Sequence, residues 1–417
     1  MLLDAARPRR FAVLRNRPLL MLMLGHFTID CHVGLLAVLY PLLIARFGLN
    51  LTTVGLVSLA YTGVSSLSQP LFGWLADRSG TRLIGLALIW TATMFALSGF
   101  APTFWLLVLL IGLAGLGSGA YHPLGALNAS AVIPAPLRNT AMSIYVTGGT
   151  LGVALGPLLG AVLFSLFGMR GTAFMLLPGL TIGLWLIYDM RARAWQEHGA
   201  TSTRTVARAP IPLVPLLAII GVMMSRSWMV FSLESFIPTW YASLGYSAGF
   251  YGPLATTVVL ASAAGTIGCG SLADRYGRKA VIIGTLVLSI PAVVLFARFP
   301  GPLGFLSGAL VGLSAASTGP LMLVMAQQLM AGRAGMASGV ILGLGFVTGA
   351  IGVPITGMLA DAYGMPVAIE TQALLVVATI GLALLLPSEA KIRALVSQAQ
   401  GYVNVQNPST DYADFTD

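Results

Sequence analysis

Twelve apolar segments, each about as long as a lipid bilayer is thick, constrain this chain more than any other feature. A membrane-spanning helix needs about 20 mainly apolar residues. Only 8% of the 417 residues are charged, whereas a soluble protein carries about 25%. We therefore predict an all-α membrane protein with twelve transmembrane helices. The segments cover residues 19–45, 50–72, 83–100, 103–130, 139–167, 171–190, 213–243, 247–269, 280–299, 302–330, 334–361 and 365–387.

The basic residues gather in every second connection between segments. Of the 22 Lys and Arg residues, all but Arg46, Arg170, Arg226 and Arg298 lie in the N-terminal stretch, these connections or the tail. Cytoplasmic loops carry such an excess, so both termini are predicted in the cytoplasm of a bacterium, with the chain in its inner membrane. The net charge of +9 then reflects topology and the lipid bilayer, and we expect no nucleic-acid partner.

The chain divides into two halves of related design. The longest polar interruption, 191–212, separates an N-terminal half (1–190) from a C-terminal half (213–387), and 388–417 forms a predicted cytoplasmic tail. Turn-forming and helix-bending residues recur in both halves at a fixed spacing of 197 residues. The pairs are Pro41/Pro238, Gly48/Gly245, Gly55/Gly252, Gly73/Gly270, Asp77/Asp274, Pro123/Pro320 and Pro157/Pro354. Two pseudo-symmetric six-helix halves are typical of secondary transporters, which bind substrate near the midplane between the halves.

Two predicted cytoplasmic connections carry one motif, "GWLADRSGTR" (73–82) and "GSLADRYGRK" (270–279). The glycines permit a tight turn, and the basic residues favour the cytoplasmic side. This duplicated pattern resembles the loop signature of the major facilitator superfamily, whose loop latches the two halves on the cytoplasmic side. The alternative is a basic turn that only fixes topology. The residues concerned are Gly73, Asp77, Arg78, Gly80 and Arg82, with Gly270, Asp274, Arg275, Gly277 and Arg278 as their repeat.

The fifth segment contains "GVALGPLLG" (152–160), with Gly152, Gly156, Pro157 and Gly160 at spacings that let helix backbones approach closely. This stretch resembles the fifth-helix signature of antiporters in the same superfamily, although plain helix packing explains such spacing equally well.

Four further stretches resemble a narrower group, the fosmidomycin-resistance drug efflux proteins. They are "HFTID" (26–30), "YPLLIARFGL" (40–49), "GSGAYHPLGA" (117–126) and "AQQLMAGRAGMASG" (326–339). The resemblance covers nearly the whole membrane domain and implies export of small, often anionic drugs in exchange for protons. One departure is Leu113, which stands where many drug–proton antiporters carry an arginine in segment four. The polar role in that segment would then fall to His122.

Three ionisable residues are predicted to meet inside the membrane. His26 and Asp30 are four residues apart and share a helix face, and antiparallel segment four brings His122 to a similar depth. His32 lies largely off that face. Their counterparts at the 197-residue spacing, Met223, Ser227 and Gly319, do not titrate, so the fold itself does not need these groups. We therefore predict proton coupling by His26, Asp30 and His122, with structural hydrogen bonding between helices as the alternative.

The C-terminal half carries a different pair, Arg226 and Glu234, at the counterparts of Ile29 and Ala37. Arg226 remains charged and can bind a carboxylate or phosphonate bidentately. The predicted substrate-binding residues are Arg226, Glu234, Tyr40, Tyr121, Trp228 and Gln327. Several of these residues could equally be packing contacts between helices.

The sequence thus predicts a monomeric drug/proton antiporter that exports small drug-like or anionic, phosphonate-type compounds by alternating access. The runner-up is a proton symporter that imports a small organic anion, and a transporter-shaped sensor is a third possibility. No nucleophile–base pair or nucleotide-binding loop is present, so an enzyme is not expected. No cofactor or metal is expected either, because His26, Asp30 and His122 lack a fourth metal ligand.

Overall fold

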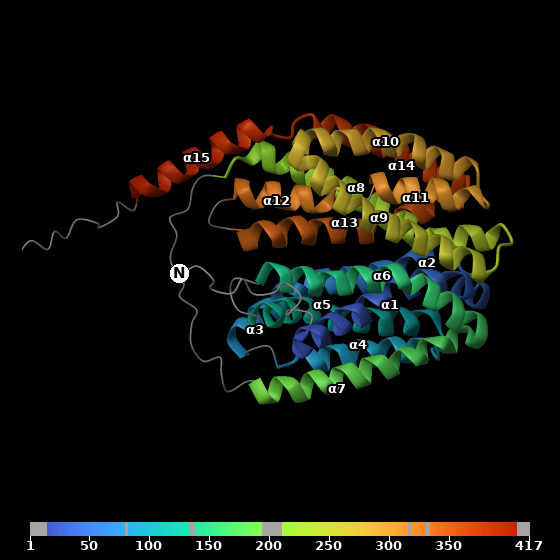
Figure 1. The fold of residues 1–417 in the computed structure, drawn as a ribbon. Coiled ribbons are helices and arrows are strands. Elements are labelled where there is room, and N and C mark those ends of the chain that lie inside the picture. The colour runs from blue at the N-terminus through green and yellow to red at the C-terminus, as the bar shows by residue number, and fades with distance from the viewer. Residues whose placement is uncertain are drawn as a thin grey trace, which may run out of the picture.

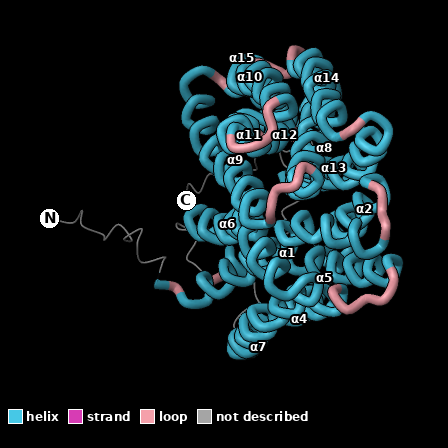
Figure 2. Tube along the Cα trace, turned by 90° about the vertical axis from the view of Figure 1, so that its right-hand side faces the viewer, coloured by secondary structure: helices cyan, strands magenta, loops and turns pink. Residues whose placement is uncertain are grey.

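The computed structural model describes residues 15–79, 82–132, 138–193, 211–315, 318–330 and 334–406, and this part of the chain contains helices and no strands. The helices run along a common direction and form two layers, one from each half of the sequence (Figure 1). Viewed from the end of the bundle, α8, α9, α13 and α14 lie on one side and α1, α4, α5 and α7 on the other (Figure 2).

The first half contains the six predicted segments. The second segment continues from α2 through a π-helical turn into α3, and a 3₁₀ turn precedes α7. The bounds are α1 (Arg17–Phe47), α2 (Leu51–Ser58), π-turn (Leu59–Gly63), α3 (Val64–Ser79), α4 (Ile84–Ser98), α5 (Phe104–Ala131), α6 (Arg138–Phe167), 3₁₀ turn (Gly168–Met175) and α7 (Leu176–Arg193).

The second half repeats this arrangement, with its fourth segment divided between α11 and α12. A further helix, α15, follows in the predicted tail and was not anticipated; the rest of the tail and most of the predicted linker lie outside the described residues. The bounds are α8 (Leu213–Ser243), α9 (Ala248–Tyr276), α10 (Arg278–Arg298), α11 (Leu303–Ala315), α12 (Gly319–Leu329), α13 (Ala334–Tyr363), α14 (Met365–Ala383) and α15 (Glu389–Gln406).

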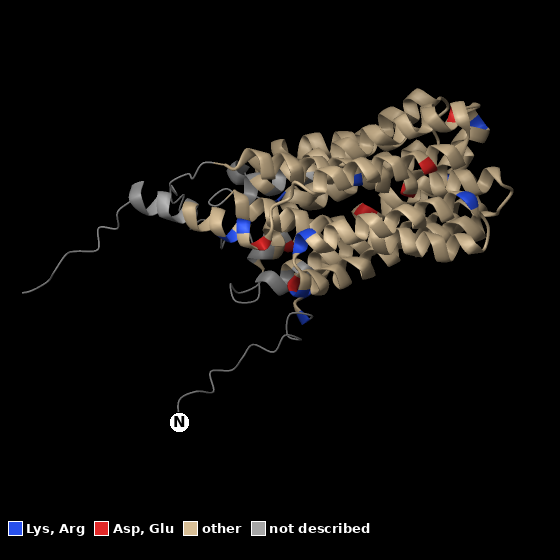
Figure 3. Cartoon of the chain, turned by 90° about the horizontal axis from the view of Figure 1, so that it is seen from above, with Lys and Arg blue, Asp and Glu red and all other residues tan. Residues whose placement is uncertain are grey.

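The helices have the length and composition of membrane spans. In the described part of the chain, ten stretches are long and apolar enough to cross a bilayer; one of them, Ile144–Asp189, contains both α6 and α7. The apolar helix α4 is shorter, at 15 residues. Charged side chains gather towards the two ends of the bundle, with few between them (Figure 3). The prediction of twelve membrane helices in two six-helix halves is confirmed.

The pairing of glycines at the 197-residue spacing has a structural basis at the ends of α1 and α8. Gly48 and Gly245 follow these helices with φ angles of 63° and 87°. Such left-handed conformations are unfavourable for side-chain-bearing residues and end a helix readily at glycine. Each half therefore turns sharply at the same place, which we name the α1–α2 end of the bundle.

The two halves contact each other through helices α2, α6, α9 and α13. A Cβ added at Gly252 of α9 would lie 3.0 Å from the Pro157 carbonyl oxygen of α6, and one at Gly55 of α2 would lie 2.9 Å from the Pro354 Cα of α13. These are the same contact made twice, because both residue pairs are related by the 197-residue spacing. Glycine is needed there because any side chain would push the halves apart.

The predicted packing motif at 152–160 places α6 against α1 as well. A Cβ on Gly156 would lie 2.7 Å from the Gly34 Cα, and one on Gly152 would overlap the Phe27 carbonyl oxygen. The motif thus fixes α6 between α1 of its own half and α9 of the other half. Close packing of α6 against its neighbours therefore explains the small residues of the motif. An additional role of the motif in antiport stays a prediction.

A single carboxylate from the second half caps a helix of the first half. The Asp361 side chain, near the end of α13, accepts hydrogen bonds from the Leu51 and Thr52 N–H groups, each at 2.8 Å, and from the Thr52 hydroxyl at 2.6 Å. These donors form the N-terminus of α2, where free N–H groups and the helix dipole favour an anion. Its counterpart in the first half is Phe164, so the repeat does not provide a second such cap.

Replacing this cap should loosen the α1–α2 end. Loss of an N-capping side chain costs about 1 kcal/mol, which corresponds to roughly a fivefold change in an equilibrium constant. In Asp361→Ala we therefore expect a cysteine introduced at Ser58, between the halves, to react about fivefold faster with a thiol reagent in detergent solution. The matched control is Glu370→Ala, which removes an ion pair to Arg298 within the second half. If the cysteine at position 58 reacts equally fast in the otherwise unchanged protein, in Asp361→Ala and in Glu370→Ala, then Asp361 does not hold the halves together.

Candidate functional site: a buried His–Asp–His cluster and an axial cavity

A cluster of three ionisable side chains joins α1 to α5. Asp30 of α1 lies between two histidines: His26 Nε2 is 3.2 Å from Asp30 Oδ2, and His122 Nε2 is 3.2 Å from Asp30 Oδ1. The side chain of His26 is 8% exposed, that of Asp30 15% and that of His122 29%. His122 is therefore the most exposed member of the cluster. The structure brings together the three residues whose meeting the sequence predicted; their role in proton coupling stays a proposal.

Hydrogen bonds on the other side of each imidazole show where its hydrogen atoms lie. His26 Nδ1 is 2.8 Å from the Tyr145 carbonyl oxygen, and His122 Nδ1 is 2.8 Å from the Ser118 carbonyl oxygen. A carbonyl oxygen only accepts, so each Nδ1 carries a hydrogen and donates it. Each Nε2 then faces a carboxylate oxygen, and these two contacts attract only if a proton lies in each. Both contacts are therefore attractive only when the cluster holds two protons more than two neutral imidazoles and one carboxylate would carry.

Helix α6 closes the cluster from a third side. The Tyr145 ring stacks on the His26 ring at 4.2 Å between centroids. A Cβ on Gly149 would lie 2.5 Å from both Asp30 Oδ2 and His26 Nε2, so no larger residue fits without moving the cluster. The contacts of Tyr145 and Gly149 with the cluster were not predicted. The Tyr145 carbonyl oxygen that accepts from His26 belongs to the backbone and has no sequence signal. Gly149, in contrast, follows Gly148 within a helix, where each glycine costs about 1 kcal/mol, and such a pair indicates a close approach.

His32, the second histidine near Asp30 in sequence, is directed elsewhere. Its ring packs edge-on against Phe95 of α4, with centroids 4.7 Å apart, and its Nδ1 donates to the Ile29 carbonyl oxygen at 3.2 Å. The side chain is fully buried among the helices of the first half. His32 thus lies off the face shared by His26 and Asp30, as helical geometry suggested.

The cluster is also the part of the described chain whose donor atoms most resemble a metal site. The ligand atoms of His26, Asp30 and His122 lie within 4.8 Å of one another. Two imidazoles and a carboxylate would give three of the four ligands of a tetrahedral zinc site. No further His, Cys, Asp or Glu of the described residues joins them at this distance. We therefore treat the cluster as a titrating group, and the absence of a metal stays a prediction.

In the second half, an arginine occupies the region that corresponds to this cluster. The Arg226 guanidinium lies 3.9 Å (Nη1) from Met223 Sδ, and a Cβ on Gly319 would lie 3.2 Å from the same nitrogen. Met223 and Gly319 are the counterparts of His26 and His122 at the 197-residue spacing. The second half therefore places a permanent cation where the first half places titrating imidazoles.

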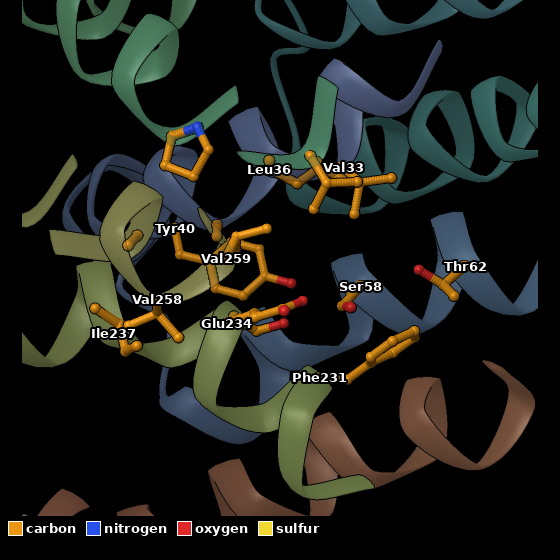
Figure 4. A pocket seen from close by; sticks show the side chains of 16 residues that line it. Val33, Leu36, Tyr40, Ser58, Thr62, Phe231, Glu234, Ile237, Val258 and Val259 are labelled. Carbon is orange, nitrogen blue, oxygen red and sulfur yellow. The ribbon is translucent and has the colours of Figure 1, made fainter. Parts of the chain in front are cut away.

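A cavity lies between the two halves, closer to the α1–α2 end than Asp30. It is lined by side chains of α1, α2, the following π-turn, α6, α8 and α9. Figure 4 shows the Glu234 carboxylate directed towards Tyr40 and Ser58, with Phe231 on the neighbouring turn of α8. Of the six predicted binding residues, Tyr40 and Glu234 line this cavity; the other four are not among its lining residues.

Two of those four residues make defined contacts elsewhere. The Trp228 indole donates to the Thr356 hydroxyl of α13 at 3.0 Å, and the Tyr121 hydroxyl donates to the Leu22 carbonyl oxygen at 3.0 Å. Gln327 is partly buried on α12. Trp228 and Tyr121 therefore join helices within one half, which favours packing over ligand binding for both.

Comparisons with known proteins agree with this architecture. A solved bacterial homologue of the human lysosomal transporter Spinster, in an inward-facing and occupied conformation, superimposes with a TM-score of 0.75 and 17% identity over 93% of this chain and 98% of its own. The family model of the Major Facilitator Superfamily matches residues 22–268 and 217–408. The chain belongs to the major facilitator superfamily.

Two bacterial members of the superfamily are similar over most of their length. The uncharacterized MFS-type transporter YfnC of Bacillus subtilis (strain 168) is 31% identical over 90% of this chain and 94% of its own. The fosmidomycin resistance protein of Escherichia coli (strain K12) is 27% identical over 81% of this chain and 85% of its own. Members of the superfamily are transporters, so the prediction of a membrane transporter and not an enzyme is confirmed.

The first copy of the superfamily loop motif is only partly described. Gly73 lies within α3 and Arg82 is exposed. Gly80 and the side chains of Asp77 and Arg78 fall outside the described part of the structure, so their predicted latch role stays a prediction.

The second copy holds the C-terminal helix. Arg278 forms an ion pair with Glu389 of α15 (Nε–Oε1, 3.0 Å) and donates to the Gln328 side chain at 2.9 Å. Gly277 has a φ of 84°, and Asp274 is exposed. In this structure Arg278 therefore joins α10 and α12 of the second half to α15 of the tail. Helix α15 is the element that sequence reasoning missed.

Proposed function

We propose that this transporter is a proton-coupled antiporter that exports small drug-like or anionic, phosphonate-type compounds by alternating access. The observation that carries the proposal is the His26–Asp30–His122 cluster, whose geometry needs two protons. With one proton fewer, one Nε2 lone pair would face a carboxylate oxygen at 3.2 Å and repel it. Because His122 is on α5 and Asp30 on α1, proton loss weakens a contact between two helices.

The direction and orientation of the proposed transport follow from the charge distribution and the resemblance to drug exporters. We place the N-terminal end of the bundle in the cytoplasm of a bacterium, because cytoplasmic loops are rich in Lys and Arg. The α1–α2 end, with the Asp361 cap, would then face outward. The two imidazoles and the carboxylate of the cluster are all groups that can accept and release a proton.

Arg226 supports the attraction of an anionic substrate in this proposal. Its guanidinium keeps its charge and presents paired N–H donors to a carboxylate or phosphonate. Its position corresponds to the proton cluster of the first half, so substrate and protons would be bound by related regions of the two halves.

The proposal is tested in proteoliposomes that contain a pH-sensitive dye, with phenylphosphonate, benzoate or tetraphenylphosphonium added outside. An antiporter that takes up substrate releases lumenal protons, so the lumen becomes more alkaline. The same experiment with a symporter makes the lumen more acidic, which would instead support proton-coupled import of an organic anion. Substrate uptake without a change of pH would contradict proton coupling.

Removing the cation should weaken anion transport selectively. Hydrogen bonds to charged groups contribute about 1.5–3 kcal/mol, so Arg226→Gln should raise the half-saturating concentration of phenylphosphonate roughly 10- to 100-fold. The dye assay measures this concentration directly. Arg298→Gln is the matched control, because Arg298 is an exposed arginine at the end of α10. Unchanged saturation in Arg226→Gln would remove this residue from the proposed binding site.

A further inference from the structure

The cavity that contains Glu234 lies on the pseudo-twofold axis that relates the two halves. Many of its lining residues occur as pairs separated by 197 residues, one member from each half, and both members face the same space. The pairs are Gly34/Phe231, Ala37/Glu234, Tyr40/Ile237, Ser58/Ala255 and Thr62/Val259. A ligand in this cavity would therefore touch both halves at equivalent positions.

The two walls of the cavity differ in chemistry despite this symmetry. The first half contributes the hydroxyls of Tyr40, Ser58 and Thr62, where the second half has only apolar side chains. The second half contributes the Glu234 carboxylate, where the first half has Ala37. At each of these positions the other half has an apolar residue, so the repeated fold itself does not require a polar group there.

The Glu234 carboxylate lacks a counterpart at close range. No hydrogen bond or ion pair joins it to another residue of the described chain, although it is electrostatically attracted to Arg226. None of the sixteen residues that line the cavity is Lys, Arg or His. A carboxylate in such apolar surroundings is costly unless a cation or a proton compensates it. The cavity therefore favours a ligand that brings positive charge.

Glu234, Tyr40 and Ser58 converge on one region of the cavity (Figure 4), and the Tyr40 hydroxyl lies beside those of Ser58 and Ser235. A protonated primary amine has three N–H donors and no acceptor. It could donate to the carboxylate on one wall and to hydroxyl oxygens on the other wall. The remaining lining, with Phe231, is largely apolar.

We propose that this axial cavity is a binding site for organic amines, with the ammonium group between Glu234 and the Tyr40 and Ser58 hydroxyls. The proposal rests on the proposed function in that the amine would be a transported compound. It adds a second class of substrate beside the anions attracted by Arg226. Since the cavity lies close to the contacts at the α1–α2 end, an amine bound there would bridge the halves next to the end that we place outward.

The first test compares three probes of nearly equal shape: 4-phenylbutylamine, 4-phenylbutanol and 4-phenylbutyrate. Their affinities for the full-length protein in detergent are measured by calorimetry. We expect the amine to bind at least about tenfold more tightly than the alcohol, and the acid to bind least, because an ion pair adds a charge-assisted bond. Equal affinities for amine and alcohol in the wild-type protein would overturn the proposal without any variant.

Variants then locate the charge. Glu234→Gln should reduce the amine affinity by about tenfold or more and leave the alcohol affinity nearly unchanged, whereas Glu370→Gln, at an exposed ion pair, should change neither. The double variant Glu234→Ala with Ala37→Glu moves the carboxylate to the opposite wall of the same cavity and should restore preference for the amine. Amine affinity that is unchanged in Glu234→Gln would overturn the assignment.

The two proposals can fail separately. If the amine binds through Glu234 but its transport moves no protons, the proton-coupled function fails and the cavity assignment stands. If phenylphosphonate transport moves protons and the amine does not bind more tightly than the alcohol, the cavity assignment fails and the proposed function stands. Asp30→Asn should retain amine binding in either case, because Asp30 is not among the residues that line the cavity.

Discussion

Asp30→Asn is expected to abolish proton-coupled transport while leaving the protein able to bind and exchange substrate. In the wild-type cluster, both histidine Nε2 atoms face oxygens of the Asp30 carboxylate at 3.2 Å, so the contacts need protons. A side-chain amide has nearly the same shape, but its NH₂ group can donate to a neutral imidazole without any added proton. The amide oxygen still faces the other Nε2, but a neutral amide does not stabilise a protonated imidazole as the carboxylate does. The variant thus weakens proton binding at the cluster with little change in packing.

The expected measurements are the dye signal and substrate exchange in proteoliposomes. The pH change on addition of phenylphosphonate should fall to that of liposomes without protein. Exchange of radiolabelled for unlabelled phenylphosphonate should continue, because it needs no net proton movement. Glu370→Gln, which changes a carboxylate outside the cluster in the same way, should retain both activities. A normal proton signal in Asp30→Asn would show that another group carries the proton.

Gly149→Ala should impair transport strongly although it removes no titrating group. The added methyl would lie 2.5 Å from Asp30 Oδ2 and from His26 Nε2, so either the cluster or α6 must move. Overpacking of this kind costs about 1–3 kcal/mol, or roughly 5- to 150-fold in an equilibrium constant. We expect the initial rate of the phenylphosphonate-dependent pH change to fall by a factor in this range.

A matched glycine separates this steric effect from the general effect of a Gly→Ala change on a helix. Gly284→Ala in α10 places the same methyl where no atom lies within 4 Å, and transport should be unaffected. The unfolding temperature of both variants in detergent shows whether the protein is intact. If Gly149→Ala transports as fast as Gly284→Ala, the close approach of α6 to the cluster has no functional role.

The arrangement of the helices could be predicted from the sequence because the bilayer leaves few alternatives. Apolar length located all twelve segments, and a spacing of four residues placed His26 and Asp30 on one face. The antiparallel direction of segment four brought His122 to the same depth. These inferences use helix geometry alone, which tertiary contacts do not change.

The remaining features depend on contacts that no local pattern reveals. Trp228 was predicted to bind substrate, yet its indole is bound to Thr356, 128 residues away. Asp361 resembles any acid near a helix end until α2 of the other half is placed beside it. The axial cavity does have a signal in the sequence, because the 197-residue pairs Ala37/Glu234 and Ser58/Ala255 both differ in polarity.

The measurement that tests the central claim most directly is proton release from the purified protein when substrate binds. Phenylphosphonate is added to the protein in weakly buffered detergent solution near pH 7, and the released protons are counted with a pH indicator. If substrate binding at Arg226 is coupled to proton loss from the His26–Asp30–His122 cluster, the wild-type protein should release protons and Asp30→Asn should release none while still binding phenylphosphonate. Substrate binding without proton release from the wild-type protein, or equal release from both proteins, would contradict this account.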